Sequence, residues 1–96
     1  AQAWFIEVKS RHPSADSITL TRNEALAALN HPDRFILALV EVVDAKANKV
    51  GYIRDLGASG ALDGFKSGSL LATSLNLPLK ELWSRVVTED MHEVSV

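Results

Sequence analysis

The chain has 96 residues, of which 47% are hydrophobic, and it carries a formal net charge of −2 and no cysteine. This size and composition predict one folded domain over residues 1–96, with a hydrophobic core of its own. The missing cysteines exclude disulfide bonds and thiolate metal sites, and the charge argues against a uniformly basic nucleic-acid surface. No apolar run is long enough to span a membrane and no secretory leader is evident, so we expect a cytoplasmic protein.

The first predicted element is a strand over residues 4–10, whose Trp, Phe, Ile and Val are typical of a pleated, half-buried surface. It also carries opposite charges at Glu7 and Lys9, which are two residues apart and therefore project from one face of a strand. A solvated ion pair is the simple explanation of this Glu-x-Lys triplet. The pair also matches the needs of phosphodiester hydrolysis, with a metal-binding carboxylate beside a lysine that polarises water.

A turn over residues 11–16, a short strand over 17–21 and a helix over 22–31 follow. Thr21 and Glu24 match the Ser/Thr-x-x-Glu capping box, in which each side chain binds the backbone N–H of the other residue. Apolar residues then recur at helical spacing, and an Asn-His-Pro segment predicts the end of the helix.

The longest apolar run lies in residues 34–43 and predicts a central strand that is buried on both faces. A polar hairpin loop over 44–48 and a returning strand over 49–54 follow it. We expect these two strands and the strand over 4–10 to belong to one sheet.

The last third of the chain begins with residues 57–68, which are small and glycine-rich and predict a loop. This loop lacks the Gly-Lys-Ser/Thr order of a phosphate-binding P-loop. An apolar stripe predicts a helix over 78–87, and the residues from Thr88 onward predict a solvated tail. The whole order of elements predicts an α/β (α+β) fold, a mixed β-sheet with flanking helices.

Few residues have a pattern that indicates chemistry. His12, His31 and His92 lie in a turn, at a helix end and in the tail, without the spacing of zinc ligands. There is no cysteine nucleophile and no Gly-x-Ser-x-Gly motif. Two clusters remain, the Glu7–Lys9 pair and the helix start at Asn23-Glu24.

Three segments carry a family resemblance. They read Trp-Phe-Ile-Glu-Val-Lys-Ser over residues 4–10, Ile-Thr-Leu-Thr-Arg-Asn-Glu over 18–24, and Arg-Phe-Ile-Leu-Ala-Leu-Val-Glu-Val over 34–42. In this order they resemble the NO VEIN C-terminal domains, with an (I/V)EVK strand, an (L/I)(T/S)xNE helix start and a Tyr/Phe-rich strand. The resemblance covers residues 4–56 and extends to Leu75–Trp83.

That family is similar to the restriction-endonuclease-like nucleases with the PD-(D/E)XK signature. In those nucleases the Glu and Lys of the E-x-K strand and an Asp on the preceding strand form the active centre. The resemblance implies a partial restriction-endonuclease-like core and Mg²⁺-dependent DNA cleavage within a larger nucleic-acid-processing protein. It implies that Glu7 is the Mg²⁺ ligand and that Lys9 orients the attacking water or holds the scissile phosphate.

The chain departs from this pattern before the E-x-K strand. Only Ala1-Gln2-Ala3 precede the strand, and Asp16 lies after it, in a turn, where it is a poor substitute for the signature Asp. We therefore expect the C-terminal part of a nuclease-like domain from a longer protein, which binds Mg²⁺ weakly and is inactive alone.

Contacts with nucleic acid would use the first half of the chain. Residues 1–54 contain seven Lys or Arg against six Asp or Glu, whereas residues 55–96 contain three against six. An exposed Asn at a helix start can hold phosphate, although a Glu there also has the simpler role of a cap. The candidate substrate-binding residues are Arg11, Arg22, Asn23 and Glu24.

Two further expectations concern geometry and assembly. Glu7 and Lys9 should point together toward the helix start at Asn23, because a short turn returns the chain beside their strand. The strand over 4–10 should be an unpaired edge, which predicts self-association as a homodimer. Two alternatives to the nuclease stay open: a non-catalytic protein–protein interaction module of the same fold, and a structural domain whose Glu7–Lys9 pair only solvates a sheet face.

Overall fold

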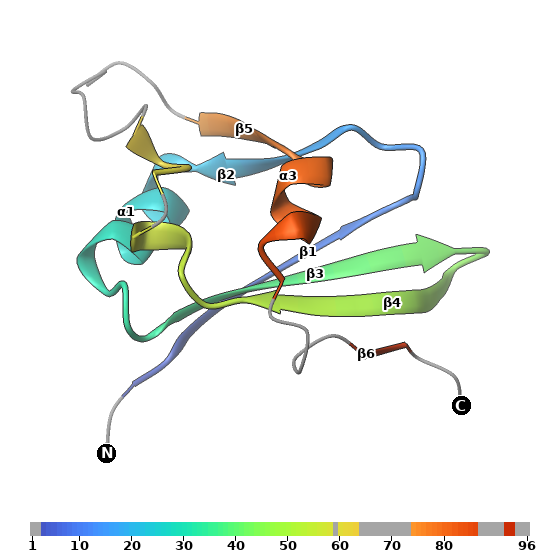
Figure 1. The fold of residues 1–96 in the computed structure, drawn as a ribbon, viewed down its shortest axis with the longest axis horizontal. Helices are drawn as coiled ribbons and strands as arrows, with labels where there is room; N and C mark the ends of the chain where they lie inside the picture. Colours follow the sequence, from blue (N-terminus) through green and yellow to red (C-terminus); the bar gives the residue numbers. More distant parts are fainter. Residues whose placement is uncertain (1–2, 59, 64–73, 87–91, 94–96) are drawn as a thin grey trace.

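The computed structural model describes residues 3–58, 60–63, 74–86 and 92–93 and shows an α+β fold, as predicted (Figure 1). The four-stranded main sheet has the order β1-β3-β4-β6, and a two-stranded sheet pairs β2 with β5. The strands are β1 (Phe5–Arg11), β2 (Ser17–Thr21), β3 (Phe35–Val43), β4 (Lys46–Ile53), β5 (Ser74–Pro78) and β6 (His92–Glu93). The helical elements are α1 (Arg22–Asn30), the 3-10 turn η1 (Leu56–Ala58) and α3 (Leu79–Ser84).

The main sheet contains the three strands that were predicted to share it. β1 runs parallel to β3, from Phe5 opposite Phe35 to Arg11 opposite Glu41, and β4 returns antiparallel to β3. A parallel pair requires a crossover connection, which here consists of β2 and α1. The crossover brings the start of α1 next to β1 and so prepares the site described below.

The hairpin between β3 and β4 is tighter than the predicted loop over 44–48. β4 begins at Lys46, so the strand predicted over 49–54 starts earlier and only Asp44 and Ala45 form the turn. Their φ angles are 52° and 62°, as a two-residue type I′ hairpin requires. No glycine marks this turn in the sequence, and the polar residues therefore suggested a longer loop.

The hydrophobic core lies between the main sheet and a covering layer that contains α1, η1, the β2–β5 sheet and α3 (Figure 1). The inner face of β3 contributes Leu37 and Leu39, at 0% and 1% exposure. On the outer face the small Ala38 is buried, but Ile36 and Val40 are partly exposed. The prediction of burial on both faces is thus correct for the inner face and wrong for much of the outer face, because the described covering layer lies on one side.

Helix α1 begins with the predicted capping box. Thr21 accepts at Oγ1 from the Glu24 N–H at 3.2 Å, and Glu24 accepts at Oε1 from the Thr21 N–H at 2.9 Å. The helix buries Ala25 and Ala28 against the core. Gly57 of η1 packs so closely on α1 that a Cβ there would clash with the Ala28 carbonyl oxygen. Gly57, predicted to lie in a loop, is therefore a buried packing residue.

The C-terminal part of the chain differs most from the prediction. β5 was not predicted, and it pairs antiparallel with β2. Helix α3 is shorter than the predicted helix over 78–87, and Pro78 is its N-cap. In the predicted tail, His92 and Glu93 pair with β4 as β6. Parts of three predicted segments, residues 59, 64–68, 87–91 and 94–96, lie outside the described residues.

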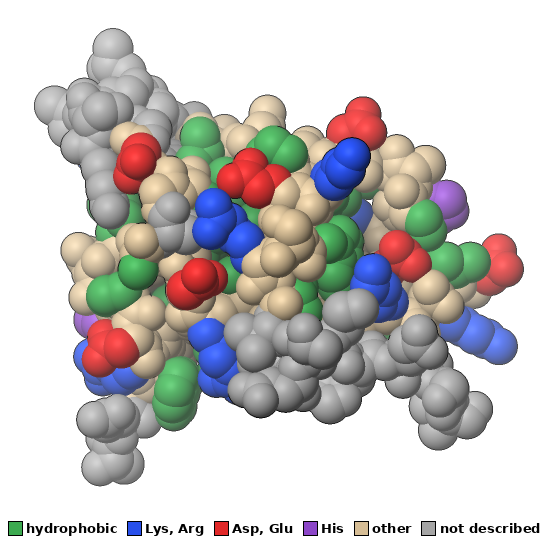
Figure 2. All heavy atoms as spheres, in the orientation of Figure 1, with side chains coloured by type: hydrophobic (Ala, Val, Ile, Leu, Met, Phe, Trp, Pro, Cys, Tyr) green, Lys and Arg blue, Asp and Glu red, His purple; other side chains and the backbone are tan. Residues whose placement is uncertain are grey.

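The face of the molecule seen in Figure 2 has mixed charge. On the face seen in Figure 2, acidic and basic side chains alternate with apolar ones, and the described residues form no extended region of a single charge. Within the described ranges, no helix is both long enough and apolar enough to cross a membrane. On the face seen in Figure 2, selective binding of a charged ligand therefore depends on a local arrangement of side chains.

Candidate functional site

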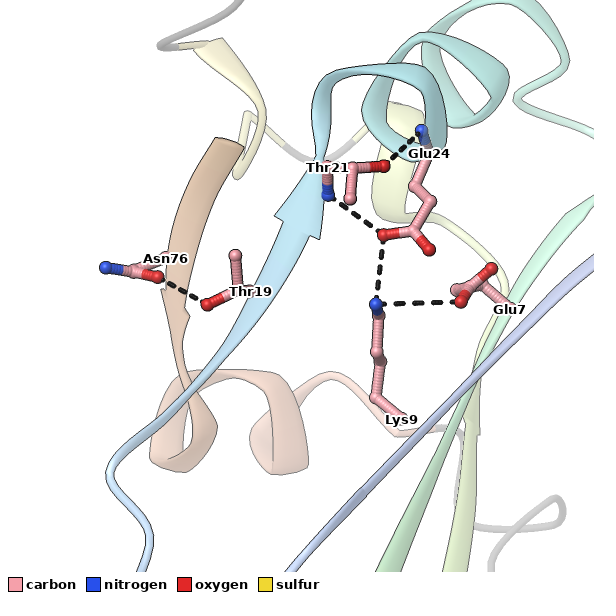
Figure 3. Close-up of polar contacts among 6 residues, drawn as sticks. All are labelled: Glu7, Lys9, Thr19, Thr21, Glu24 and Asn76. Carbon is pink, nitrogen blue, oxygen red and sulfur yellow. Dashed lines mark hydrogen bonds and ion pairs between the residues drawn. The ribbon is translucent and has the colours of Figure 1, made fainter. Parts of the chain in front are cut away.

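Three charged side chains meet where β1 passes the start of α1 (Figure 3). The Lys9 Nζ lies 2.9 Å from Glu24 Oε1 and 3.6 Å from Glu7 Oε1. Glu7 and Lys9 are both on the inner face of β1, opposite Leu37 and Leu39 of β3, and their side chains are 29% and 21% exposed. The prediction that they share one face and point toward the start of the helix is confirmed.

Glu24 is at once a helix cap and a member of this charged group. Its Oε1 accepts from the Thr21 N–H and from the Lys9 ammonium, each at 2.9 Å. The sequence left open whether Glu24 is a cap or a site residue; the structure shows the cap, and the same carboxylate pairs with Lys9. The capping box fixes the carboxylate, and the carboxylate in turn fixes the position of Lys9.

The two carboxylates differ in pKa. For Glu24, burial favours the neutral acid, but the hydrogen bonds from the Thr21 backbone and from Lys9 outweigh it and lower the pKa from 4.5 to about 2. For Glu7, burial and the neighbouring Glu24 carboxylate together raise the pKa. Glu24 is therefore anionic near neutral pH, and Glu7 is the carboxylate whose charged form gains most from an added cation.

A hollow of about 240 Å³ opens beside these carboxylates. We call it the acidic hollow; Glu7, Asn23 and Glu24 line it together with Phe5, Ala27 and Phe35. Two carboxylates and one amide thus stand over an apolar floor. This composition suits a small cation, or an anionic group that binds together with a cation.

A second hollow of about 200 Å³ adjoins Lys9. We call it the basic hollow, because Lys9, Arg11 and Lys80 line it with a single carboxylate, Glu41. Lys9 links the two hollows, since it lines the basic one while its ammonium reaches the carboxylates of the acidic one. Sequence reasoning missed Lys80, which comes from α3.

The structure separates the candidate substrate-binding residues into groups. Asn23 and Glu24 lie at the acidic hollow. Arg11 lines the basic hollow, and its Nε donates to the Ser17 carbonyl oxygen at 3.1 Å. Arg22 begins α1 and lines neither hollow. Asp16, the poor substitute for the signature Asp, also lines neither hollow. The four candidates therefore do not form one binding surface.

The donor set of the acidic hollow fits a weak magnesium site. Mg²⁺ is commonly held by one or two carboxylates, with water and phosphate oxygens completing its shell. Both contacts of Glu24 fall on its Oε1, whereas Glu7 Oε1 lies 3.6 Å from Lys9, beyond hydrogen-bond distance. Of the two carboxylates, Glu7 therefore has fewer hydrogen bonds to lose when it binds a cation. Across the described residues, no group of three or more His, Cys, Asp or Glu could hold a metal ion.

Among the described side chains, neither His12 nor His31 lines the acidic hollow. The His31 ring stacks on Phe5, with the ring centroids 4.2 Å apart, and His92 lies in β6. His12 lies in the turn after β1, where its Nδ1 accepts from the Ser14 N–H at 3.2 Å.

Comparison with known protein families gives a match over the first half of the chain. The family model described as Protein NO VEIN, C-terminal matches residues 1–53, which is more than half of the chain and includes all three members of the charged group. No curated protein and no solved structure matches the chain. The chain therefore belongs to the family of the NO VEIN C-terminal domain.

Proposed function

We propose that this chain is part of a Mg²⁺-dependent DNA endonuclease domain of the PD-(D/E)XK type, within a protein that processes nucleic acid. Glu7 is the metal ligand and Lys9 the catalytic residue. Glu24 is a positioning residue that acts through Lys9. The observation that supports the proposal most is the Lys9 ammonium, which two carboxylates hold at the edge of a hollow with a favourable donor set.

The chemistry follows from the charges. A bound Mg²⁺ would lower the pKa of a water molecule and offset negative charge on phosphate oxygens. Glu7 and Glu24 together outweigh the single charge of Lys9, so the acidic hollow attracts a cation. Lys9, anchored by Glu24 at 2.9 Å, offers its remaining N–H donors to a phosphate oxygen or to the attacking water. Its fixed position limits the entropy lost when substrate binds.

The proposed centre is incomplete in its acidic ligands. The signature of the PD-(D/E)XK nucleases adds an Asp on a strand before the E-x-K strand. Within the described residues, β1 has a strand neighbour on one side only, β3, so its other edge, beside Glu7, is where an additional strand would pair. We therefore expect this chain by itself to bind Mg²⁺ weakly and to leave DNA uncut.

Paramagnetic Mn²⁺ tests the metal site directly on this chain. Amide signals in NMR spectra should broaden first at Glu7 and at the start of α1, and Glu7→Gln should remove this local broadening. Glu81→Gln is the matched control, because it deletes an exposed carboxylate from α3 that pairs only with Arg85 at 3.3 Å among the described residues. Broadening that is the same in Glu7→Gln as in the wild type would exclude Glu7 as the ligand.

A second candidate function is a non-catalytic interaction module. Trp4, Ile6 and Val8 are 52%, 60% and 57% exposed, and Ile6 and Val8 lie on the outer face of the edge strand β1. An exposed apolar edge is a template for pairing with another chain. The simplest occupant is a second copy with antiparallel β1 strands and the twofold axis at Val8, because this register places Glu7 opposite the Lys9 of the other copy.

A further inference from the structure

The basic hollow has an excess of positive charge, and the described contacts of its cationic side chains do not neutralise it. Lys80 is exposed, and within the described ranges it forms no hydrogen bond or ion pair. The guanidinium of Arg11 uses Nε for the Ser17 carbonyl oxygen, its one hydrogen bond to the described part of the chain. The single carboxylate of the hollow, Glu41, already accepts from Asn48 Nδ2 at 2.7 Å.

A further donor comes from the turn after β1. The Nδ1 of His12 accepts a hydrogen bond from the Ser14 N–H. The Ser14 Oγ also lies 2.9 Å from this Nδ1 and can donate to it, so both contacts are compatible with the tautomer that carries its proton on Nε2, which is then a donor. His12 lines the basic hollow, so the hollow offers imidazole, guanidinium and ammonium donors over a floor that includes Leu39 and Trp83. Such donors suit the oxygens of a phosphate group, which are arranged tetrahedrally around the phosphorus.

The basic hollow lies further along β1 than the acidic hollow. Glu7, Lys9 and Arg11 alternate along β1, and a strand rises about 3.3 Å per residue, so Arg11 lies about 13 Å along the strand from Glu7. Lys9 lies between them and contributes to both hollows. A linear polyanion that lies along β1 would meet the acidic hollow, Lys9 and the basic hollow in that order.

We propose that the basic hollow binds a phosphate group of the nucleic-acid substrate, adjacent to the phosphodiester at Glu7 and Lys9. The inference rests on the proposed function, because that function supplies the polyanion and its direction. Arg11 and Lys80 are the principal contacts, and His12 adds an imidazole N–H donor. The same donors also suit a free phosphate, and the experiment separates these two sources.

Binding can be followed without cleavage, in EDTA, by the fluorescence of Trp83. The chain has two tryptophans, so a Trp4→Phe background leaves Trp83, at the wall of the hollow, as the reporter. The probes are an oligothymidylate and inorganic phosphate, each titrated at several salt concentrations. Lys80→Gln is the test variant, since Lys80 is exposed and its loss leaves the core intact. Lys46→Gln is the control, because it removes the same charge from the exposed start of β4 and lines neither hollow.

We expect the oligonucleotide to bind more tightly than phosphate. Lys80→Gln should weaken oligonucleotide binding about three- to tenfold and reduce the salt slope by about one, whereas Arg11→Lys should retain most of the affinity. Equal effects of Lys80→Gln and Lys46→Gln would refute the phosphate site at the basic hollow. Inorganic phosphate that binds as tightly as the oligonucleotide would refute nucleic acid as the ligand of this site.

The same titration on Glu7→Gln keeps this inference separate from the proposed function. We expect unchanged or tighter oligonucleotide binding, because a negative charge is lost next to the path of the polyanion. If the full-length gene product cuts no DNA while the Lys80 effect in this titration is intact, the nuclease function is refuted and the phosphate site stands. If the full-length gene product cuts DNA while Lys80→Gln has no specific effect on binding, the phosphate site alone is refuted.

Discussion

The substitution Glu24→Gln separates the ionic role of Glu24 from its capping role. Gln can still accept from the Thr21 N–H, since Glu and Gln both complete a capping box. What is lost is the ion pair with Lys9 at 2.9 Å. The displacement of the Glu24 pKa from 4.5 to about 2 sets an upper limit of about 3 kcal/mol on this contribution. Solvent screening at a side chain that is 23% exposed reduces our expectation to about 1–2 kcal/mol at pH 7.

The pH dependence gives the sign of the effect. Because the pKa of Glu24 is lowered on folding, its contribution is complete above about pH 4.5 and is lost as the pH falls toward 2. The pKa of Glu7 is raised on folding, so protonation of Glu7 favours the folded state and adds stability as the pH falls, opposite to the effect of Glu24. Urea unfolding followed by circular dichroism should show a wild-type advantage over Glu24→Gln at pH 7 that shrinks by pH 2.5. An advantage of the same size at both pH values would refute the ionic explanation.

Three further predictions concern the fold and the assembly. Gly57→Ala should destabilise the chain by more than about 2 kcal/mol in urea unfolding, because the added methyl group meets the Ala28 carbonyl oxygen; a loss below 0.5 kcal/mol would contradict this packing. Ala45→Gly should stabilise it by about 0.5–1 kcal/mol, because the φ of 62° favours glycine; an unchanged or lower stability would argue against the turn geometry. Light scattering should show a dimer at high protein concentration that Ile6→Lys dissociates, and a monomeric mass at every concentration would contradict pairing through β1.

Local patterns in the sequence predicted the part of the site that lies within one or two elements. The period of two in a strand places Glu7 and Lys9 on one face, and the spacing of Thr21 and Glu24 is itself the capping box. Both features depend on neighbouring residues alone, and the structure confirms both. The link between them, from Lys9 to Glu24, was expected as a direction toward the helix start and not as a specific contact.

The features that the sequence did not predict depend on distant pairings. β5 is short, and its strand conformation depends on β2, where Thr19 and Asn76 meet across 57 positions of sequence. The basic hollow exists because α3 packs near the end of β1, and no periodicity reveals where a helix will dock. The apolar stripe that contains Trp83 does pack on the core, but Lys80 on the same helix faces a hollow that only the tertiary arrangement creates.

Cleavage of a supercoiled plasmid by the full-length gene product, with Mg²⁺ or Mn²⁺, tests the central claim most directly. We predict metal-dependent nicking that Glu7→Gln and Lys9→Met abolish while their folded spectra stay like that of the wild type, and that Glu81→Gln preserves. The chain described above should show no cutting under the same conditions. Equal cutting by wild type and Glu7→Gln would remove Glu7 from the mechanism. A well-folded full-length protein that cuts none of several DNA substrates would contradict the nuclease and favour the interaction module.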